Sequence, residues 1–186
     1  MNASRDLRTE RLLLRQWREQ DREPFAAMCA DARVMKYFPS TLTREESDAL
    51  VDRIEETFAR RGFGLWAVEI PGVAPFAGFI GLTVPRFEAH FTPCVEIGWR
   101  LAGEFWNRGY ATEGAKAALA FGWDVLQLDE IVALAVPSNG ASLRVMEKLG
   151  MTRSPADDFD HPRLPEGHPL KRHVLYRIRR PSEAAP

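Results

Sequence analysis

Cysteine is scarce in this sequence of 186 residues: Cys29 and Cys94 are the only two, and they form no CxxC pair. Both are therefore expected to be buried small hydrophobic residues rather than metal ligands or disulfide partners. Long apolar runs are also missing, so no segment is expected to span a bilayer. The opening residues, MNASRDLRTE, lack the apolar core of a signal peptide. Together these absences favour a cytoplasmic protein.

An excess of positive charge is missing as well, because the formal net charge is -1 and the sequence pI is about 6.4. Such a balance gives no reason to expect nucleic acid or a membrane surface as a partner. The four histidines show no metal-site spacing with the cysteines, so we expect no metal. What is present is a hydrophobic content of 45% and a charged content of 27%, which are typical of a globular protein. The length is enough for one domain, residues 1–186, with a substantial core.

Hydrophobic periodicity predicts an α/β (α+β) chain with a mixed sheet and helices packed on it. Thr43 and Glu46 form a capping-box pattern, which predicts the start of the second helix. The run at 130–136 is almost entirely apolar, so this strand should lie in the centre of the sheet. Strands are expected over residues 11–17, 64–70, 76–82, 94–102, 130–136 and 173–178. Helices are expected over residues 21–30 and 43–61, from Gly109 onward, and within residues 138–150.

The stretch EFWNRGYATEG, residues 104–114, places Gly109 where the third helix should begin. Helices usually begin with a capping side chain, whereas a glycine leaves the first backbone N–H groups exposed. Free N–H groups and the positive end of the helix dipole together bind anions, and Gly109 and the small Ala111 would let an anion approach closely. A tight turn that needs glycine for its backbone alone is the alternative interpretation.

A second motif, PSNGASLRVMEKLGM at residues 137–151, follows the apolar strand and places Asn139 and Ser142 at a helix start. With both motifs in this order, the chain resembles the GNAT superfamily of acyl-CoA-dependent N-acetyltransferases. The family patterns [QR]-x-x-G-x-[GA] and N-x-x-[SA]-x-x-x-[YM]-x-K-x-G-[FM] correspond to WNRGYA and NGASLRVMEKLGM here. The opening TERLLLRQWREQD and the GYATEG variant look like the RimJ/RimL-like branch, which includes enzymes that acetylate ribosomal-protein N-termini. The resemblance covers residues 9–178.

The resemblance implies the GNAT fold, with a mixed twisted sheet flanked by helices, and acetyl-CoA as co-substrate. It assigns the pyrophosphate to backbone groups and one hydroxyl of the following residues: Arg108, Gly109, Tyr110, Ala111 and Thr112. It implies that Trp99 and Leu101 pair through their backbones with the pantetheine arm, and that the same strand donates an N–H to the thioester oxygen. Asn139 would bond the pantetheine near the thioester, or would instead cap the helix that contains Ser142.

Three positions depart from the family pattern. Trp106 stands where the family has Gln or Arg, so a side-chain contact to phosphate is lost while the backbone contacts can remain. Met146 stands where many members have a tyrosine proposed to protonate the leaving thiolate. Ser142 stands where many have alanine. Ser142, or a water bound to it, could supply the proton. Alternatively, Ser142 is an ordinary residue in the first turn of a helix.

Acyl transfer to an amine also needs a deprotonated amine, and a lysine-type amine with a pKa near ~10.4 is almost wholly protonated at neutral pH. Glu96 is the first candidate base, since its apolar strand neighbours would raise its pKa. The alternative is a glutamate that faces solvent in an alternating strand. The four histidines are the other candidates for the base, and all lie in loop or tail segments: His90, His161, His168 and His173.

The acceptor side is expected to involve the proline-rich segment 157–173 and the segment MKYFPSTLT, residues 35–43. The acceptor is an amine, which could belong to a protein N-terminus, a polyamine, an amino acid or an antibiotic. A non-catalytic acyl-CoA-binding module on the same fold is the alternative function, because fold does not determine activity. A homodimer is left open.

Overall fold

A computed structural model describes residues 6–181, so part of the opening segment MNASRDLRTE lies outside the described residues. Within 6–181, nine strands form a sheet in the order β1-β2-β3-β4-β5-β6-β9-β7, with β8 paired to β9. The strands are β1 (Leu7–Arg8), β2 (Leu13–Arg15), β3 (Leu65–Ile70), β4 (Ala74–Thr83), β5 (Glu96–Leu101), β6 (Glu130–Ala135), β7 (Thr152–Arg153), β8 (Phe159–Asp160) and β9 (Arg172–Arg179). The helices in this range are α1 (Arg22–Ala30), α2 (Arg44–Arg61), α3 (Tyr110–Asp124) and α4 (Gly140–Lys148).

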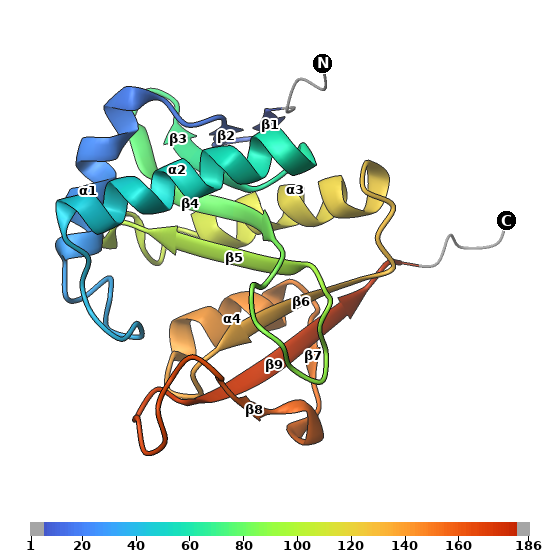
Figure 1. Ribbon diagram of the computed structural model, residues 1–186. Coiled ribbons are helices and arrows are strands. Elements are labelled where there is room, and N and C mark those ends of the chain that lie inside the picture. The colour runs from blue at the N-terminus through green and yellow to red at the C-terminus, as the bar shows by residue number, and fades with distance from the viewer. Residues whose placement is uncertain (1–5, 182–186) are drawn as a thin grey trace, which may run out of the picture.

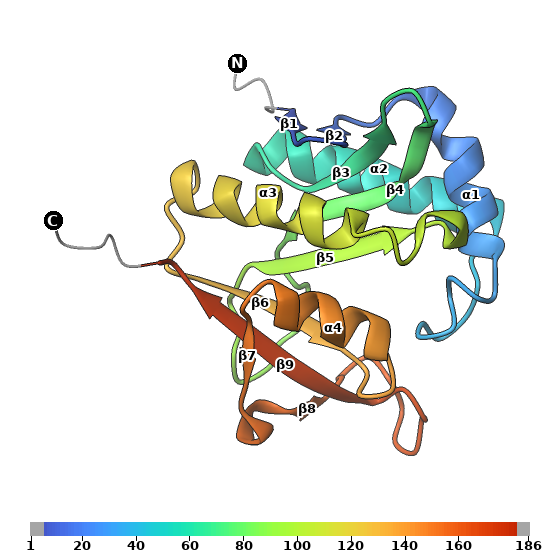
Figure 2. The ribbon, with the colours of Figure 1, turned by 180° about the vertical axis from the view of Figure 1, so that it is seen from behind.

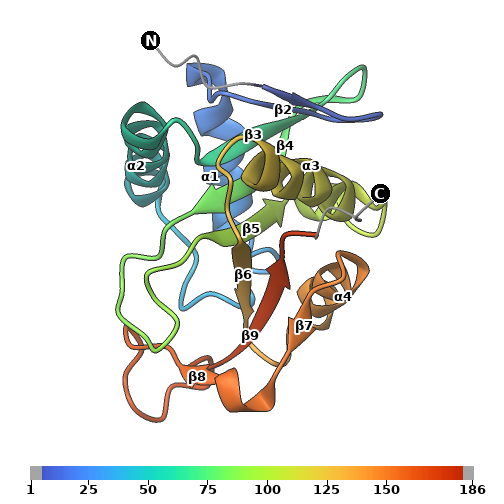
Figure 3. The same ribbon diagram turned by 90° about the vertical axis from the view of Figure 1, so that its right-hand side faces the viewer.

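The sheet is mixed, because β5 and β6 pair in parallel while the other recorded pairs are antiparallel. Figure 1 shows α2 in front of the sheet, and Figure 2 shows α3 and α4 on the opposite face. The edge view in Figure 3 separates the layers, with α1 and α2 on one side and α3 and α4 on the other. This arrangement confirms the expected mixed sheet flanked by helices.

The second helix begins and ends where the sequence predicts. The Thr43 hydroxyl accepts from the Glu46 N–H at 3.2 Å, and the Glu46 carboxylate accepts from the Thr43 N–H at 2.8 Å. This reciprocal pair satisfies two of the N–H groups that a helix start leaves free. Gly62 ends the helix in the left-handed conformation, with φ +75°.

The apolar strand β6 is central, as predicted, since it lies between β5 and β9. Helix α3 approaches the sheet closely because its inward face is made of small residues. A Cβ atom on Gly114 would lie 2.5 Å from Ile80 Cδ1, and one on Gly122 would lie 2.6 Å from Ile131 Cδ1. Larger residues at these two positions would force the Ile80 and Ile131 side chains to move.

Two expectations need correction. The predicted strand at 11–17 is shorter, with β2 limited to Leu13–Arg15, because Arg11 leaves the ladder to bond Glu113 through its backbone N–H at 2.9 Å. Cys29 is buried as expected, but Cys94 is only partly buried, since it lies in the loop before β5 at the edge of a small aromatic cluster.

Among the described residues, no helix has the length and apolar content that crossing a membrane requires.

Candidate active site

Strands β5 and β6 pair only where they begin. Glu96 is opposite Val132, and the Val132 N–H donates to the Val95 carbonyl at 2.9 Å. Beyond this point no further register pair joins the two strands within the described residues, and Figure 1 shows them separating toward their carboxyl ends. The backbone of the second half of β5 therefore has an unpaired edge facing β6.

The phase of the ladder decides which groups lie on that edge. The Ala102 N–H donates to the Ala77 carbonyl at 3.0 Å, so by alternation Arg100 and Gly98 also direct their backbone groups toward β4. Trp99 and Leu101 consequently direct theirs toward the opening. The Leu101 carbonyl is already used there, because the Trp106 indole N–H donates to it at 2.7 Å. The Trp99 groups and the Leu101 N–H stay available to a ligand.

The loop after β5 leads into the N-terminus of α3, where the first backbone N–H groups are free. Gly109 is exposed, has φ +83°, and precedes α3 without a side-chain cap. The first bond within the helix runs from the Glu113 N–H to the Gly109 carbonyl at 3.0 Å. The N–H groups of Tyr110, Ala111 and Thr112 therefore have no partner inside the helix. The dipole of α3 adds about half a positive charge at the same place. These groups can hold an anion such as a phosphate.

Arg11 holds this loop in place, a role that the sequence analysis missed. Its guanidinium donates to the Arg108 carbonyl at 3.0 Å, pairs with Glu113 at 2.6 Å and lies 4.7 Å from the centre of the Tyr110 ring. The Thr9 hydroxyl also donates to Glu113, at 2.6 Å. The loop is thus braced by a segment about a hundred residues away, which no local pattern could indicate.

Glu96 lies at the point where β5 and β6 diverge. It shares a face of β5 with Gly98 and Arg100, and Arg100 contacts Cys29 of α1, so this face looks toward α1 and α2. Burial raises the pKa of Glu96 to about 7, as its apolar neighbours led us to expect. The residue as a whole is half-buried. A carboxylate of this pKa can accept a proton at neutral pH.

Asn139 and Ser142 lie on the other side of the sheet, at the start of α4 (Figure 3). The Asn139 side-chain oxygen accepts from the Ser142 N–H at 3.2 Å, so the capping alternative is present in the structure. The Asn139 amide nitrogen is not used in this bond and can donate to a ligand. Met146, at the position of the family tyrosine, is buried.

Three of the histidines, His90, His161 and His173, lie in an aromatic cluster between the β4–β5 loop and the segment 157–173. The His161 and His173 rings lie 5.1 Å apart beside Phe159, and His90 lies 3.7 Å from Asp157. Burial lowers the pKa of both His161 and His173. No histidine contributes to the raised pKa of Glu96. Among residues 6–181, no group of three or more potential ligands is arranged to hold a metal ion.

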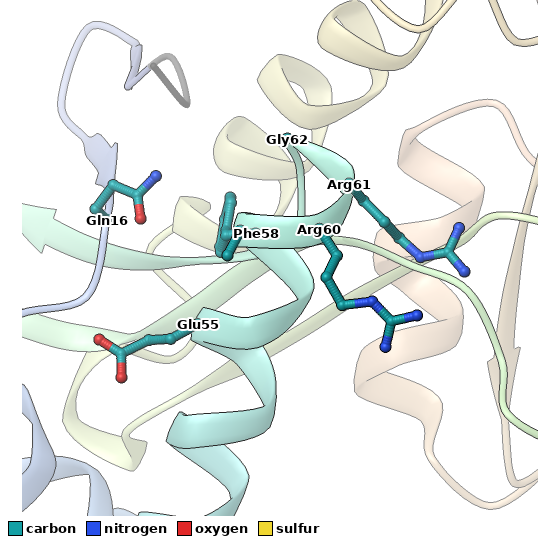
Figure 4. Close-up of a pocket in the computed structure, with 7 residues that line it drawn as sticks. Gln16, Glu55, Phe58, Arg60, Arg61 and Gly62 are labelled. Carbon is teal, nitrogen blue, oxygen red and sulfur yellow. The ribbon is translucent and has the colours of Figure 1, made fainter. Parts of the chain in front are cut away.

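Two surface pockets lie apart from Glu96. One, of about 350 Å³, lies at the end of α2 and is shown in Figure 4, where Glu55, Phe58 and Arg60 line it from the helix and Gln16 lies opposite. The other, of about 410 Å³, touches the loop before α3 at Arg108. Neither contains Glu96. The candidate site therefore rests on the open edge of β5 and the helix start, not on a closed cavity.

A parallel pair that opens beside an anion-binding helix start is the architecture of a coenzyme A-dependent acyltransferase. Residues 11–152 match the Acetyltransferase (GNAT) domain. The chain belongs to this family of N-acetyltransferases, whose members generally use acetyl-CoA. It is 31% identical to the Bacillus subtilis protein named as the N-acetyltransferase YnaD, covering 86% of this chain and 88% of that one.

Solved structures agree on the fold. A GNAT-family acetyltransferase from Bacillus anthracis superposes with a TM-score of 0.77 at 30% identity, covering 94% of this chain and 98% of that one. A ribosomal-protein-S5-alanine acetyltransferase from Vibrio fischeri superposes with a TM-score of 0.73 at 16% identity, covering 94% and 96%. The second likeness shows the fold alone, so it is compatible with the RimJ/RimL-like branch without establishing the acceptor.

Proposed function

We propose that this protein transfers the acetyl group of acetyl-CoA to a primary amine, with Glu96 as the general base. The observation that carries the proposal is the position of Glu96: a half-buried residue, with a carboxyl group of pKa about 7, at the point where β5 and β6 separate. The acceptor amine, from a protein N-terminus or a small molecule, would approach from the side of α1 and α2, toward which Glu96 points.

The chain offers fitting partners for each part of acetyl-CoA, which supplies an acetyl thioester when bound. The pyrophosphate fits the free N–H groups of Tyr110, Ala111 and Thr112, next to the exposed Gly109. The Thr112 hydroxyl and the Arg108 backbone would complete this set. The pantetheine amides fit the open backbone groups of Trp99 and Leu101, and the Asn139 amide nitrogen, at the helix start that follows β6, would be a further donor.

The two proton transfers would then take place on opposite faces of the sheet. Glu96 would take a proton from the acceptor ammonium group, directly or through a water, on the α1–α2 side, and the free amine would then attack the thioester carbonyl. The leaving thiol departs on the side of α4, where Ser142 or a water bound to it can return a proton. A coenzyme thiol resembles a cysteine thiol, with a pKa near ~8.5, so the thiolate leaves readily without strong assistance.

Replacing Ser142 by alanine should therefore lower turnover only modestly, by roughly tenfold or less, below the usual contribution of a general acid. The backbone bond from residue 142 to Asn139 would remain, so the start of α4 should stay intact. Steady-state thiol release measures the effect. A loss of several thousandfold would mean that Ser142 is the principal acid.

Replacing Trp106 by phenylalanine should raise the dissociation constant of acetyl-CoA by about 3- to 10-fold. The indole N–H bond to the Leu101 carbonyl holds the loop against β5, and losing one such bond costs about 0.5–1.5 kcal/mol. Binding would then have to order the loop again. Isothermal titration of acetyl-CoA checks this, and an unchanged affinity would show that the loop needs no such anchor.

The decisive experiment for the function is release of free thiol from acetyl-CoA in the presence and absence of added primary amines. Amine-dependent release together with acetylated product supports the transferase. Binding of acetyl-CoA without any release, across a panel of protein N-terminal peptides, amino acids and polyamines, would favour the non-catalytic acyl-CoA-binding module instead.

A further inference from the structure

Arg100 is a partly buried cation without a carboxylate partner among residues 6–181. Its guanidinium lies 4.0 Å from the centre of the Phe38 ring and 5.2 Å from that of Phe79, and it donates to Cys29 Sγ at 3.4 Å. Its Nε is shut off from solvent and has no hydrogen-bond partner. Within residues 6–181, no carboxylate lies within 4.0 Å of it. Burial lowers the pKa of Arg100, but a guanidinium stays charged in proteins.

The same chain shows how a buried arginine is ordinarily accommodated. Arg15 is 2% exposed, and its guanidinium bonds both carboxylate oxygens of Asp21, at 2.7 and 2.9 Å, and Glu69 at 2.8 Å. Buried charges are costly unless they are paired and hydrogen-bonded. Arg100 has no such carboxylate among residues 6–181, and because it is only partly buried, its charge is open to water or to an anionic ligand.

Arg100 also stands beside open space on the face that carries Glu96. Gly98 lies between these two residues on the same face of β5, and a Cβ atom there would meet nothing within 4 Å. Four strand positions separate the Cα atoms of Glu96 and Arg100 by roughly 13 Å. Neither charge contributes to the pKa shift of the other, so they do not neutralise each other.

Phe38 belongs to the connection between α1 and α2 and covers Arg100 from the solvent side. It is 38% exposed, which is unusual for a phenylalanine and leaves an apolar wall beside the open space. A molecule lying over Gly98 would thus have a carboxylate at one end, a guanidinium at the other and an aromatic wall near the guanidinium.

We infer that the acceptor carries a carboxylate that Arg100 binds, while its amine lies at Glu96. This inference rests on the proposed acetyl transfer and narrows its acceptor to molecules with both an amine and a carboxylate, such as amino acids and short peptides. Polyamines, which carry no anionic group, are disfavoured. The Arg100 guanidinium has further terminal N–H groups besides the one that bonds Cys29, and such groups suit the oxygens of a carboxylate.

The test compares matched acceptors in wild type, Arg100→Met and Arg100→Lys. The probes are L-alanine against L-alaninamide, and L-alanyl-L-alanine against L-alanyl-L-alaninamide, so that charge and length vary separately. The quantity is the ratio of kcat/KM for the carboxylate over its amide. Because amidation also changes the pKa of the amine, only the change of this ratio between protein variants is interpreted.

The wild type should prefer the carboxylate in at least one pair, and Arg100→Met should reduce that ratio by about 30-fold or more. Arg100→Lys should restore part of it, because it keeps the charge but loses the planar fork. Arg53→Met, which removes an exposed arginine of α2, should leave the ratio unchanged. The dipeptide pair should show the larger effect if the separation of Glu96 and Arg100 sets the acceptor length.

An unchanged ratio in Arg100→Met, with amide acceptors still acetylated, would overturn the carboxylate site and leave the transferase standing. If no amine supports thiol release, the proposed function fails. The carboxylate site at Arg100 is then tested separately, by the binding of a dipeptide. In that case L-alanyl-L-alanine should raise the melting temperature of wild type but not of Arg100→Met. The absence of such a rise in wild type would overturn the carboxylate site. Should Arg100→Met fail to fold, Arg100→Lys carries the comparison alone.

Discussion

Replacing Glu96 by glutamine should lower turnover at pH 7 by roughly 10²–10⁴-fold while leaving the affinity for acetyl-CoA nearly unchanged. Glutamine keeps the shape of the side chain and removes its basicity. Glu96 faces α1 and α2, away from the helix start that would bind the pyrophosphate, so cofactor binding should not depend on its charge. Steady-state kinetics and titration of acetyl-CoA measure the two quantities separately.

The pH dependence gives this prediction a sharper form. Since the pKa of Glu96 is about 7, wild-type activity should rise as pH increases through 7 and the carboxyl group loses its proton. The Glu96→Gln variant should lack this rise and should recover activity only as the pH approaches the pKa of the amine itself. Glu88→Gln, which makes the same change on an exposed loop, is the matched control. Wild-type kinetics in Glu96→Gln at pH 7 would refute the assignment and turn attention to the histidines.

The same substitution should stabilise the fold above neutral pH. The folded pKa of Glu96, about 7, exceeds the reference value of 4.5, so the folded state binds more protons than the unfolded state between these pH values. Its contribution to stability is therefore fully present below pH 4.5 and is lost as pH rises to 7. At pH 8, Glu96→Gln should be more stable than wild type by about 2–3 kcal/mol, and denaturant unfolding at pH 4 and 8 checks this. An equal difference at both pH values would contradict a raised pKa.

Replacing Gly109 by valine should abolish the rise in melting temperature that acetyl-CoA causes in wild type. At a ligand concentration of 100 times the dissociation constant, that rise corresponds to about 2.7 kcal/mol. Gly109 has φ +83°, which a β-branched residue rarely adopts, and its Cβ would lie 3.3 Å from Arg11 Nη2. The side chain would also stand where a phosphate has to approach the free N–H groups of α3.

Backbone strain at Gly109 would lower the melting temperature without ligand as well, by the equivalent of about 1–3 kcal/mol. Gly62→Val provides the matched control, because Gly62 has φ +75° and open space around it at the end of α2. This control should lose stability in the same way and keep its full response to acetyl-CoA. An acetyl-CoA response that survives in Gly109→Val would count against the loop as the pyrophosphate site.

Local patterns predicted much of the fold because capping and periodicity act over a few residues. Thr43 and Glu46 form the capping box that the sequence indicates, and β6 is central because its apolar run needs cover on both faces. The glycine at the start of α3 is likewise visible in the sequence, since a bare helix start is unusual whatever surrounds it. The burial of Cys94 and the length of β2 were predicted less well, because both the burial of a residue and the end of a strand pairing depend on distant neighbours.

The sequence by itself determined the order of the helices and of the longer strands, the two motifs and the family to which they point, but not the two-residue strands β1, β7 and β8. Only the tertiary structure decided that β5 and β6 part after Glu96, that Arg11 braces the loop through Glu113, and that the Arg100 Nε is enclosed without a hydrogen-bond partner. Each of these facts is a relation between segments far apart in the chain. A charge is costly or harmless according to what packs around it, and no local pattern records which distant residues will be its neighbours.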